Sequence, residues 1–103
     1  MCGLSGELRF DGAAADVAAV QRMAECMQAR GPDGSGVVAY GPAAFAHRRL
    51  KVIDLSDAAE QPMVDPDLGL VLVFNGCIYN YPALREELGG LGYRFFSNGD
   101  TEV

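Results

Sequence analysis

Cys2, which directly follows Met1, is the strongest candidate for a catalytic residue in the sequence. Removal of Met1 would leave Cys2 with both a thiol and a free α-amine. That amine has an ordinary pKa of about 7.7–8.0, so near neutral pH part of it can accept a proton. The thiol, with an ordinary pKa of about 8.5, is an intrinsically strong nucleophile. One residue would then supply nucleophile and base, although a cysteine at the second position can equally be a coincidence.

Three other segments carry groups that could serve such a nucleophile. His47-Arg48-Arg49 places two guanidinium groups between apolar segments, where they could bind a carboxylate or simply be solvated. Asn75-Gly76 offers a side-chain amide and an unobstructed N–H that could bind a developing oxyanion. The same dipeptide is also typical of a type I′ turn. Asp100 could meet an ammonium group or cap a turn.

A fourth segment, Arg30-Gly31-Pro32-Asp33-Gly34, is typical of a rigid turn after a helix. Its composition favours a structural role over a chemical one.

Composition restricts the class of protein. A chain of 103 residues corresponds to one domain, and 8 basic against 14 acidic residues give a net charge of −6. This balance argues against nucleic acid or an anionic membrane as a partner. The longest apolar run, 70–74, is too short to span a bilayer, and no signal peptide is visible, so we expect a cytoplasmic protein.

The cysteines argue against a disulfide framework and a structural metal. Cys2, Cys26 and Cys77 are odd in number and widely spaced, without a C-x-x-C, and His47 is the only histidine. Zinc bound by these four residues is stoichiometrically conceivable but lacks the usual short ligand spacing. We expect reduced thiols and no metal, with Cys26 packed within a helix.

Hydrophobic periodicity predicts the elements of the first half of the chain. Residues 4–10 alternate as a strand with one buried apolar face, and a helix follows Asp16 as its N-cap. Residues 37–40 and 43–46, on either side of Gly41-Pro42, predict a hairpin.

The second half of the chain also has patterns typical of both strands and helices. The run 70–74 reads as a strand inside a sheet covered on both faces. A helix should follow Asn80, with Pro82 in its first turn and Gly89-Gly90 at its end. Its apolar stripe comprises Leu84, Leu88 and Leu91. A further strand is expected at 93–96. The whole is an α+β pattern of layered sheets and helices.

Taken together, six motifs resemble the glutaminase domain of the asparagine synthetase family, a class II glutamine amidotransferase and N-terminal-nucleophile hydrolase. They occur in the family's order and rough spacing across the whole chain. They are Met1-Cys2-Gly3-Leu4-Ser5-Gly6, Arg30-Gly31-Pro32-Asp33, His47-Arg48-Arg49-Leu50, Gln61-Pro62-Met63, Phe74-Asn75-Gly76-Cys77-Ile78-Tyr79-Asn80 and Gly99-Asp100-Thr101-Glu102-Val103. Residues 1–12 and 53–57 look most similar to N-acetylglutaminylglutamine amidotransferase-like members.

The resemblance implies a role for each matching residue. Cys2 would attack the side-chain carboxamide of L-glutamine, and Asn75 with the Gly76 N–H would form the oxyanion hole. For the amino-acid end of the substrate, Arg49 with the main chain near Ile53 would bind the α-carboxylate. Asp100 would pair with the α-ammonium group.

The sequence departs from the family pattern at one position in these motifs and in its length. Cys77 stands where the family motif has Glu, and no role is transferred to it. The resemblance implies a mostly antiparallel αββα sandwich, of which 1–103 would be the truncated N-terminal portion. The synthetase domain that would receive the ammonia is not in this sequence. No cofactor is expected here, since ATP and magnesium would belong to that domain. The resemblance also leaves a homodimer open.

Two other classes of function stay open at this point. The chain could be a non-catalytic fragment or interaction module of the same fold. A thiol-redox or metal protein would need a reversible cysteine pair or a bound metal.

Overall fold

The computed structural model describes residues 1–103, which form two helices, one 3₁₀ helix and five strands. Their order is β1 (Gly3–Leu8), α1 (Val17–Cys26), β2 (Gly34–Tyr40), β3 (Ala43–Arg49), η1 (Asp57–Ala59), β4 (Met63–Asp65), β5 (Leu70–Leu72) and α2 (Tyr81–Gly90). No helix combines the length and the apolar content that crossing a membrane requires.

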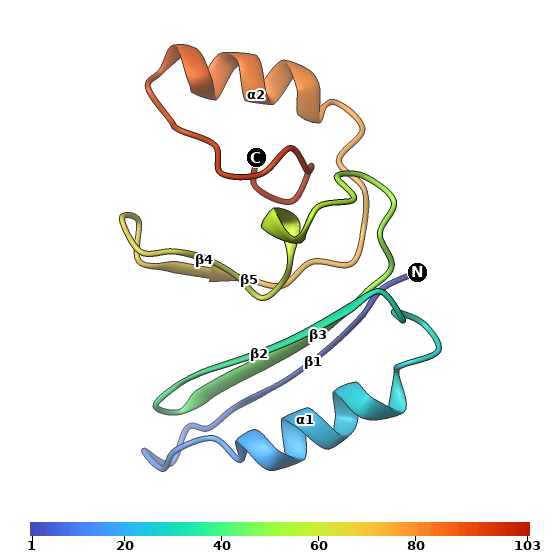
Figure 1. Cartoon of the computed structure of the whole chain (residues 1–103). Coiled ribbons are helices and arrows are strands. Elements are labelled where there is room, and N and C mark those ends of the chain that lie inside the picture. Colours follow the sequence, from blue (N-terminus) through green and yellow to red (C-terminus); the bar gives the residue numbers. More distant parts are fainter.

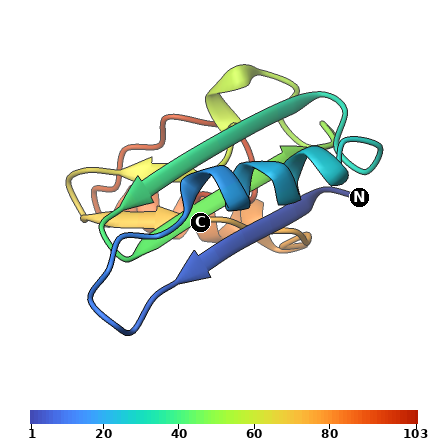
Figure 2. The same cartoon turned by 90° about the horizontal axis from the view of Figure 1, so that it is seen from below.

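The elements stack in four layers (Figure 1). Helix α1 covers one face of a three-stranded sheet of order β1-β3-β2 and runs roughly along its strands, as the view from below shows (Figure 2). The two-stranded sheet β4-β5 lies beyond the other face, and α2 lies outermost. All paired strands are antiparallel. The α+β class and the αββα layering are therefore confirmed.

The first sheet packs on α1 through small residues. Asp16 caps this helix, since its side chain accepts the Ala19 N–H at 2.9 Å. The buried core between helix and sheet comprises Ala15, Val20, Ala24, Ala44 and Ala46. Side chains alternate along a strand, so the intervening β3 residues Phe45, His47 and Arg49 face away from α1, toward the rest of the chain.

Two strand predictions are wrong. β5 ends at Leu72 and pairs only with β4, so Leu70 and Leu72 are exposed rather than covered on both faces. Residues 93–96 form no strand. There the Glu102 carboxylate accepts the N–H groups of Phe96 and Ser97, which therefore do not need a neighbouring strand.

Two burial predictions are also wrong. Leu4 and Leu8 lie on the exposed face of β1, because α1 covers the face that carries Ser5, whose hydroxyl donates to the Val20 carbonyl. Cys26 is the last residue of α1 and is exposed.

The second helix is where the sequence places it, but it is loosely packed. Asn80 occupies the N-cap position without a side-chain hydrogen bond, and Pro82 lies in the first turn. Leu84 and Leu88 are half-buried, whereas Leu91, expected in the same stripe, is exposed. No residue of α2 is fully buried.

Candidate active site

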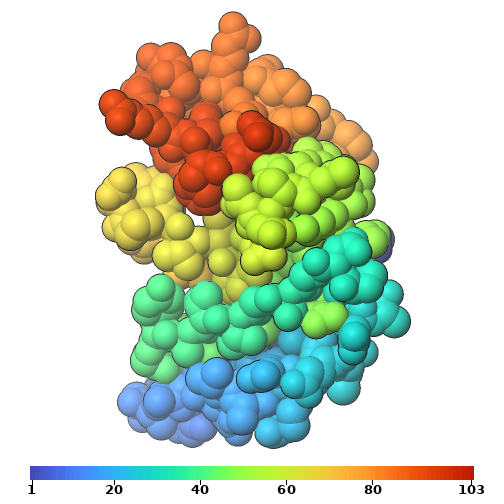
Figure 3. Space-filling model, viewed as in Figure 1, coloured from blue at the N-terminus to red at the C-terminus, as the bar shows by residue number.

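The six residues predicted to form the site all line one cavity of about 390 Å³. They are Cys2, Arg49, Ile53, Asn75, Gly76 and Asp100. The cavity lies between the N-terminal half of the chain (residues 1–50) and the C-terminal half (residues 51–103), which are stacked one on the other in Figure 3. The six predicted residues, up to 98 positions apart in the sequence, thus share one cavity.

Cys2 is held at the start of β1 by neighbouring main chain. Its half-buried sulfur accepts the Leu50 N–H at 3.3 Å and lies 3.6 Å from the Leu50 carbonyl oxygen. The Arg30 side chain donates to the Cys2 carbonyl at 3.3 Å. The thiol position is therefore fixed from two sides, while the preceding Met1 is largely exposed.

The turn that contains Arg30 supports this arrangement. A Cβ on Gly31 would lie 2.3 Å from the main-chain carbon and oxygen of Arg48, so only glycine fits without a shift. Arg48 in turn donates to the Gly31 carbonyl at 3.0 Å. Asp33 accepts the Lys51 N–H at 2.9 Å. The predicted turn after the helix is present, and its hydrogen bonds join Cys2 to the end of β3.

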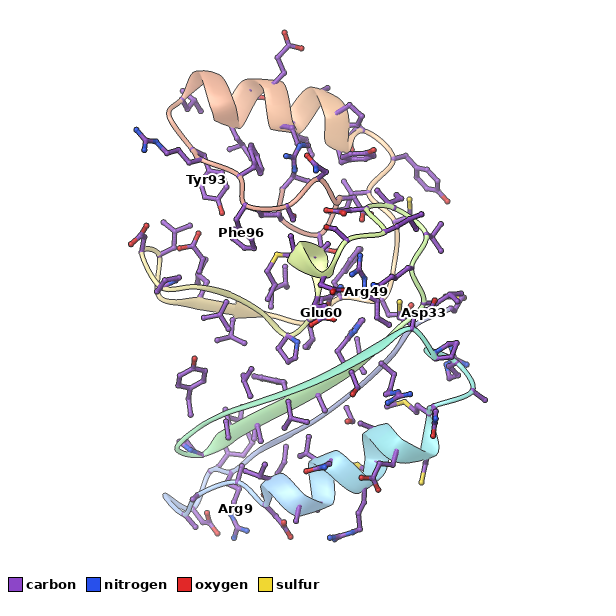
Figure 4. The ribbon with its side chains drawn as sticks, viewed as in Figure 1. Arg9, Asp33, Arg49, Glu60, Tyr93 and Phe96 are labelled. Atoms are coloured by element: carbon purple, nitrogen blue, oxygen red, sulfur yellow. The ribbon has the colours of Figure 1, made fainter.

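Arg49 is the cation of the site. Only 5% of its surface is exposed, so it is not one of a solvated pair of charges. Figure 4 shows its side chain between the two halves of the chain. Three of its N–H groups donate to main-chain carbonyls, those of Ser56 at 2.6 Å, Ile53 at 3.5 Å and Asp54. A guanidinium has five N–H donors. Two therefore remain, and no carboxylate of the chain forms a salt bridge with Arg49.

Asp100 is the anion of the site. It is 7% exposed, and one of its oxygens accepts the Ile78 N–H at 2.8 Å. No lysine or arginine pairs with it. A buried carboxylate without a cation is costly, and a substrate ammonium group would offset that cost.

Asn75 and Gly76 follow β5 in a loop that leads to α2, so they are not the turn of a hairpin. The Asn75 side chain is half-buried and lines the cavity. A Cβ on Gly76 would lie 2.6 Å from the ring of Phe74, so the glycine makes room for that ring. Both residues line the same cavity as Cys2.

The other two cysteines differ in their relation to the cavity. Cys77 is exposed and lines it, whereas Cys26 lies away from it on α1. No group of three or more His, Cys, Asp or Glu side chains is arranged to hold a metal ion. The zinc alternative through Cys2, Cys26, Cys77 and His47 thus has no structural support.

Four polar residues around the cavity were not assigned a role from the sequence. Asp54 accepts from the Ser56 hydroxyl and N–H and from the Asn98 N–H, and these bonds lower its pKa to about 2. Glu102 folds the segment before Asp100, as described above. Gln61 and His47 both bind the main chain of Phe74. Three of the four lie inside the recognised motifs, which was the only available signal.

Comparison with known sequences shows what the chain is similar to. Residues 1–103 match a family model described as "Glutamine amidotransferase domain". The chain is 40% identical over 84 residues to asparagine synthetase [glutamine-hydrolyzing] 1 of Bacillus subtilis (strain 168), which covers 82% of the chain and 13% of that relative.

Two further relatives are also similar over most of this chain and over a small part of their own length. Asparagine synthetase B [glutamine-hydrolyzing] of Escherichia coli (strain K12) is 42% identical over 81 residues, 79% of the chain and 14% of the relative. The nodule asparagine synthetase [glutamine-hydrolyzing] of Pisum sativum is 32% identical over 104 residues, 100% of the chain and 17% of the relative. The chain therefore spans less than a fifth of the length of these relatives.

Proposed function

The chain belongs to the family of glutamine amidotransferase domains found in asparagine synthetases, and on that premise we propose that it binds L-glutamine and releases ammonia from its side chain. The observation that carries the proposal is the single cavity that gathers a thiol, a guanidinium, a carboxylate and the Asn75-Gly76 loop. These four groups match the amide, α-carboxylate and α-ammonium of a free glutamine molecule.

The amino-acid end of the substrate would be held by the two charges of the cavity. The remaining N–H groups of Arg49 would bind the α-carboxylate. Asp100 would bind the α-ammonium group through the oxygen that Ile78 leaves free. The Ile53 carbonyl already accepts from Arg49, so it would support the guanidinium rather than contact the substrate carboxylate.

The reaction would begin after Met1 is removed. The Cys2 amine takes the thiol proton, and the sulfur attacks the side-chain carbonyl carbon of glutamine. The oxyanion that forms accepts hydrogen bonds from the Asn75 side-chain amide and the Gly76 N–H. The amine then passes the proton to the leaving nitrogen, so ammonia departs and a thioester remains. Water cleaves this thioester to give glutamate and restores the thiol.

The same proposal extends to the longer protein of which this chain would be a part. Residues 1–103 would be the N-terminal portion of a type-2 glutamine amidotransferase domain, whose ammonia passes to a synthetase domain in the same parent chain. That domain would use ATP and magnesium to activate a carboxylate. The relation to N-acetylglutaminylglutamine amidotransferase-like members, a homodimer and a cytoplasmic location stay predictions of the sequence.

The decisive experiment replaces the nucleophile in the full-length protein. We expect Cys2→Ala to abolish glutamine-dependent product formation and to leave ammonia-dependent formation in place, since only the supply of ammonia needs the thiol. Cys26→Ala is the matched control, because this exposed cysteine lies away from the cavity. Equal loss of both activities in Cys2→Ala would show a structural role for the thiol.

A second measurement separates the catalytic proposal from the non-catalytic alternative. Mass spectrometry of the purified protein should show that Met1 has been removed, and a glutaminase assay should show glutamate release. A folded protein that keeps Met1 or releases no glutamate would instead be an inert module of this fold.

A further inference from the structure

The main chain of Phe74 lies between two buried polar side chains that come from different parts of the fold. Its N–H donates to Gln61 Oε1 at 2.6 Å, and its carbonyl accepts from His47 Nε2 at 3.2 Å. Gln61 is 7% exposed and His47 is fully buried. Phe74 lies two residues beyond the end of β5, so these bonds replace the strand pairing that has ended.

These two bonds act on the residue that directly precedes the Asn75-Gly76 loop. With both polar groups of the Phe74 peptide backbone held, the chain enters the loop in one orientation. The Phe74 ring also fills the space beside Gly76. The direction of the Asn75 amide and the Gly76 N–H therefore depends on where Phe74 is held.

Gln61 reaches a second part of the cavity as well. Its Nε2 donates to the Thr101 hydroxyl at 3.3 Å, next to Asp100. Its own main chain lies against β2, where a Cβ on Gly36 would come within 2.4 Å of the Gln61 carbonyl oxygen. Gln61 thus contacts the first sheet through its main chain, and the Phe74 backbone and the Asp100 loop through its side chain.

The chemistry of His47 fits the same arrangement. Since a carbonyl can only accept, Nε2 must carry the proton, which leaves Nδ1 as an acceptor. Nδ1 is the one buried side-chain N or O atom in the chain without a hydrogen-bond partner. Burial, with a smaller effect of Arg49, lowers the pKa of His47, which favours this neutral form. The single N–H donor of the neutral histidine therefore binds the Phe74 carbonyl.

We propose that Gln61 and His47 are positioning residues for glutamine hydrolysis: together they fix the Phe74 backbone so that Asn75 and Gly76 point at the oxyanion. This inference rests on the proposed glutaminase function. Neither side chain would touch the substrate, so their effect should fall on the chemical step more than on glutamine binding.

The test uses a series of substitutions at Gln61 in the full-length protein. Gln61→Asn keeps the amide but is one methylene too short to reach Phe74, and Gln61→Met removes the polar atoms. Both should lower the kcat of glutamate formation about 10- to 100-fold, the effect of a small misplacement of catalytic groups, with little change in KM. Gln61→Glu keeps an acceptor at the same reach and should retain most of the kcat.

Substitutions at His47 form a second, independent pair. His47→Leu removes the donor to the Phe74 carbonyl, whereas His47→Gln can place an amide N–H close to the position of Nε2. We expect a fall in kcat for the first and substantial rescue by the second. Thermal unfolding of every variant identifies those that remain folded.

The outcomes separate this inference from the proposed function on which it rests. An unchanged kcat in folded Gln61→Asn, or an equal loss in Gln61→Asn and Gln61→Glu, would overturn the positioning role. Cys2→Ala is measured in the same assay. If Cys2→Ala still releases glutamate, the proposed function itself fails, whereas an inactive Cys2→Ala beside unimpaired Gln61 and His47 variants refutes only the inference.

Discussion

The N-terminal half and the C-terminal half of the chain are each stabilised internally by a different kind of interaction. In the N-terminal half, α1 buries an alanine-rich face against a sheet with continuous antiparallel pairing. In the C-terminal half α2 has no fully buried residue, and acidic side chains organise the loops. Asp65 accepts the Tyr93 hydroxyl, and Glu102 accepts two main-chain N–H groups.

The two halves also contribute different groups to the cavity. The N-terminal half supplies the thiol of Cys2 and the guanidinium of Arg49, both attached to the paired sheet. The C-terminal half supplies the Asn75-Gly76 loop and Asp100, both on segments without regular pairing. The backbone that leads into the Asn75-Gly76 loop is thus held by side-chain hydrogen bonds from His47 and Gln61, not by strand pairing.

The largest expected effect comes from the C-terminal half. Asn75→Ala should lower the glutaminase kcat by about 10²–10³, because one oxyanion donor is lost. Steady-state kinetics on the full-length protein measure this. Asn80→Ala is the matched control, since the Asn80 side chain makes no capping bond. An effect confined to KM would remove Asn75 from the oxyanion hole.

A smaller effect on a different parameter is expected from the N-terminal half. Arg49→Lys should raise the KM for glutamine about 10- to 100-fold, because an ammonium group replaces neither the planar donor set nor its bonds to the 53–56 loop. Arg22→Lys changes an exposed arginine of α1 that does not line the cavity and should leave KM near that of the parent protein. Equal KM values for the two variants would contradict the role of Arg49.

The contrast in packing predicts opposite responses to one added methyl group. Gly31→Ala should destabilise the fold by about 1–3 kcal/mol, because the methyl would overlap the Arg48 backbone. Gly89→Ala in α2 meets open space and should stabilise by about 0.5–1 kcal/mol. Thermal unfolding of both variants measures this. If the two changes have the same sign, the two halves do not differ in packing as described.

The smallest effect concerns the link between Asp54 and the Asp100 loop. Hydrogen bonds from Ser56 and the Asn98 N–H lower the Asp54 pKa from 3.8 to about 2. A lowered carboxyl pKa stabilises the fold above pH 3.8, and this contribution is lost as the pH falls toward 2. Asp54→Asn should therefore be less stable than the parent near pH 6, with the difference shrinking toward pH 2.

Denaturant midpoints at several pH values test this expectation. Asp67→Asn is the control, because the exposed Asp67 side chain accepts no hydrogen bond. A parent-to-variant difference that stays constant from pH 6 to pH 2 would show that the Asp54 charge has no part in stability.

The sequence predicted the paired elements better than the loops. The hairpin at Gly41-Pro42 and the helix capped by Asp16 follow from local signals and are confirmed. The strand expected at 93–96 is absent because Glu102, several residues later, takes its N–H groups. Alternation along β1 revealed two faces, but it could not show that α1 covers the one with Ser5.

The site was predicted through motifs rather than through geometry. All six residues line one cavity, although their catalytic and binding roles stay predictions until variants are measured. Gln61 lies inside a recognised motif, yet its importance depends on partners 13 and 40 residues away. Sequence alone does not pair residues over such distances without a local pattern.

The missing side chain of Gly36 sets how closely the two halves of the chain approach each other. Because the Gln61 carbonyl occupies the space of a Cβ, any other residue at this position would act as a wedge between the sheets. Such a wedge would move the Asn75-Gly76 loop away from the thiol without touching either. The distance between the Cys2 sulfur and the Asn75-Gly76 loop therefore depends on β2, a strand that does not line the cavity.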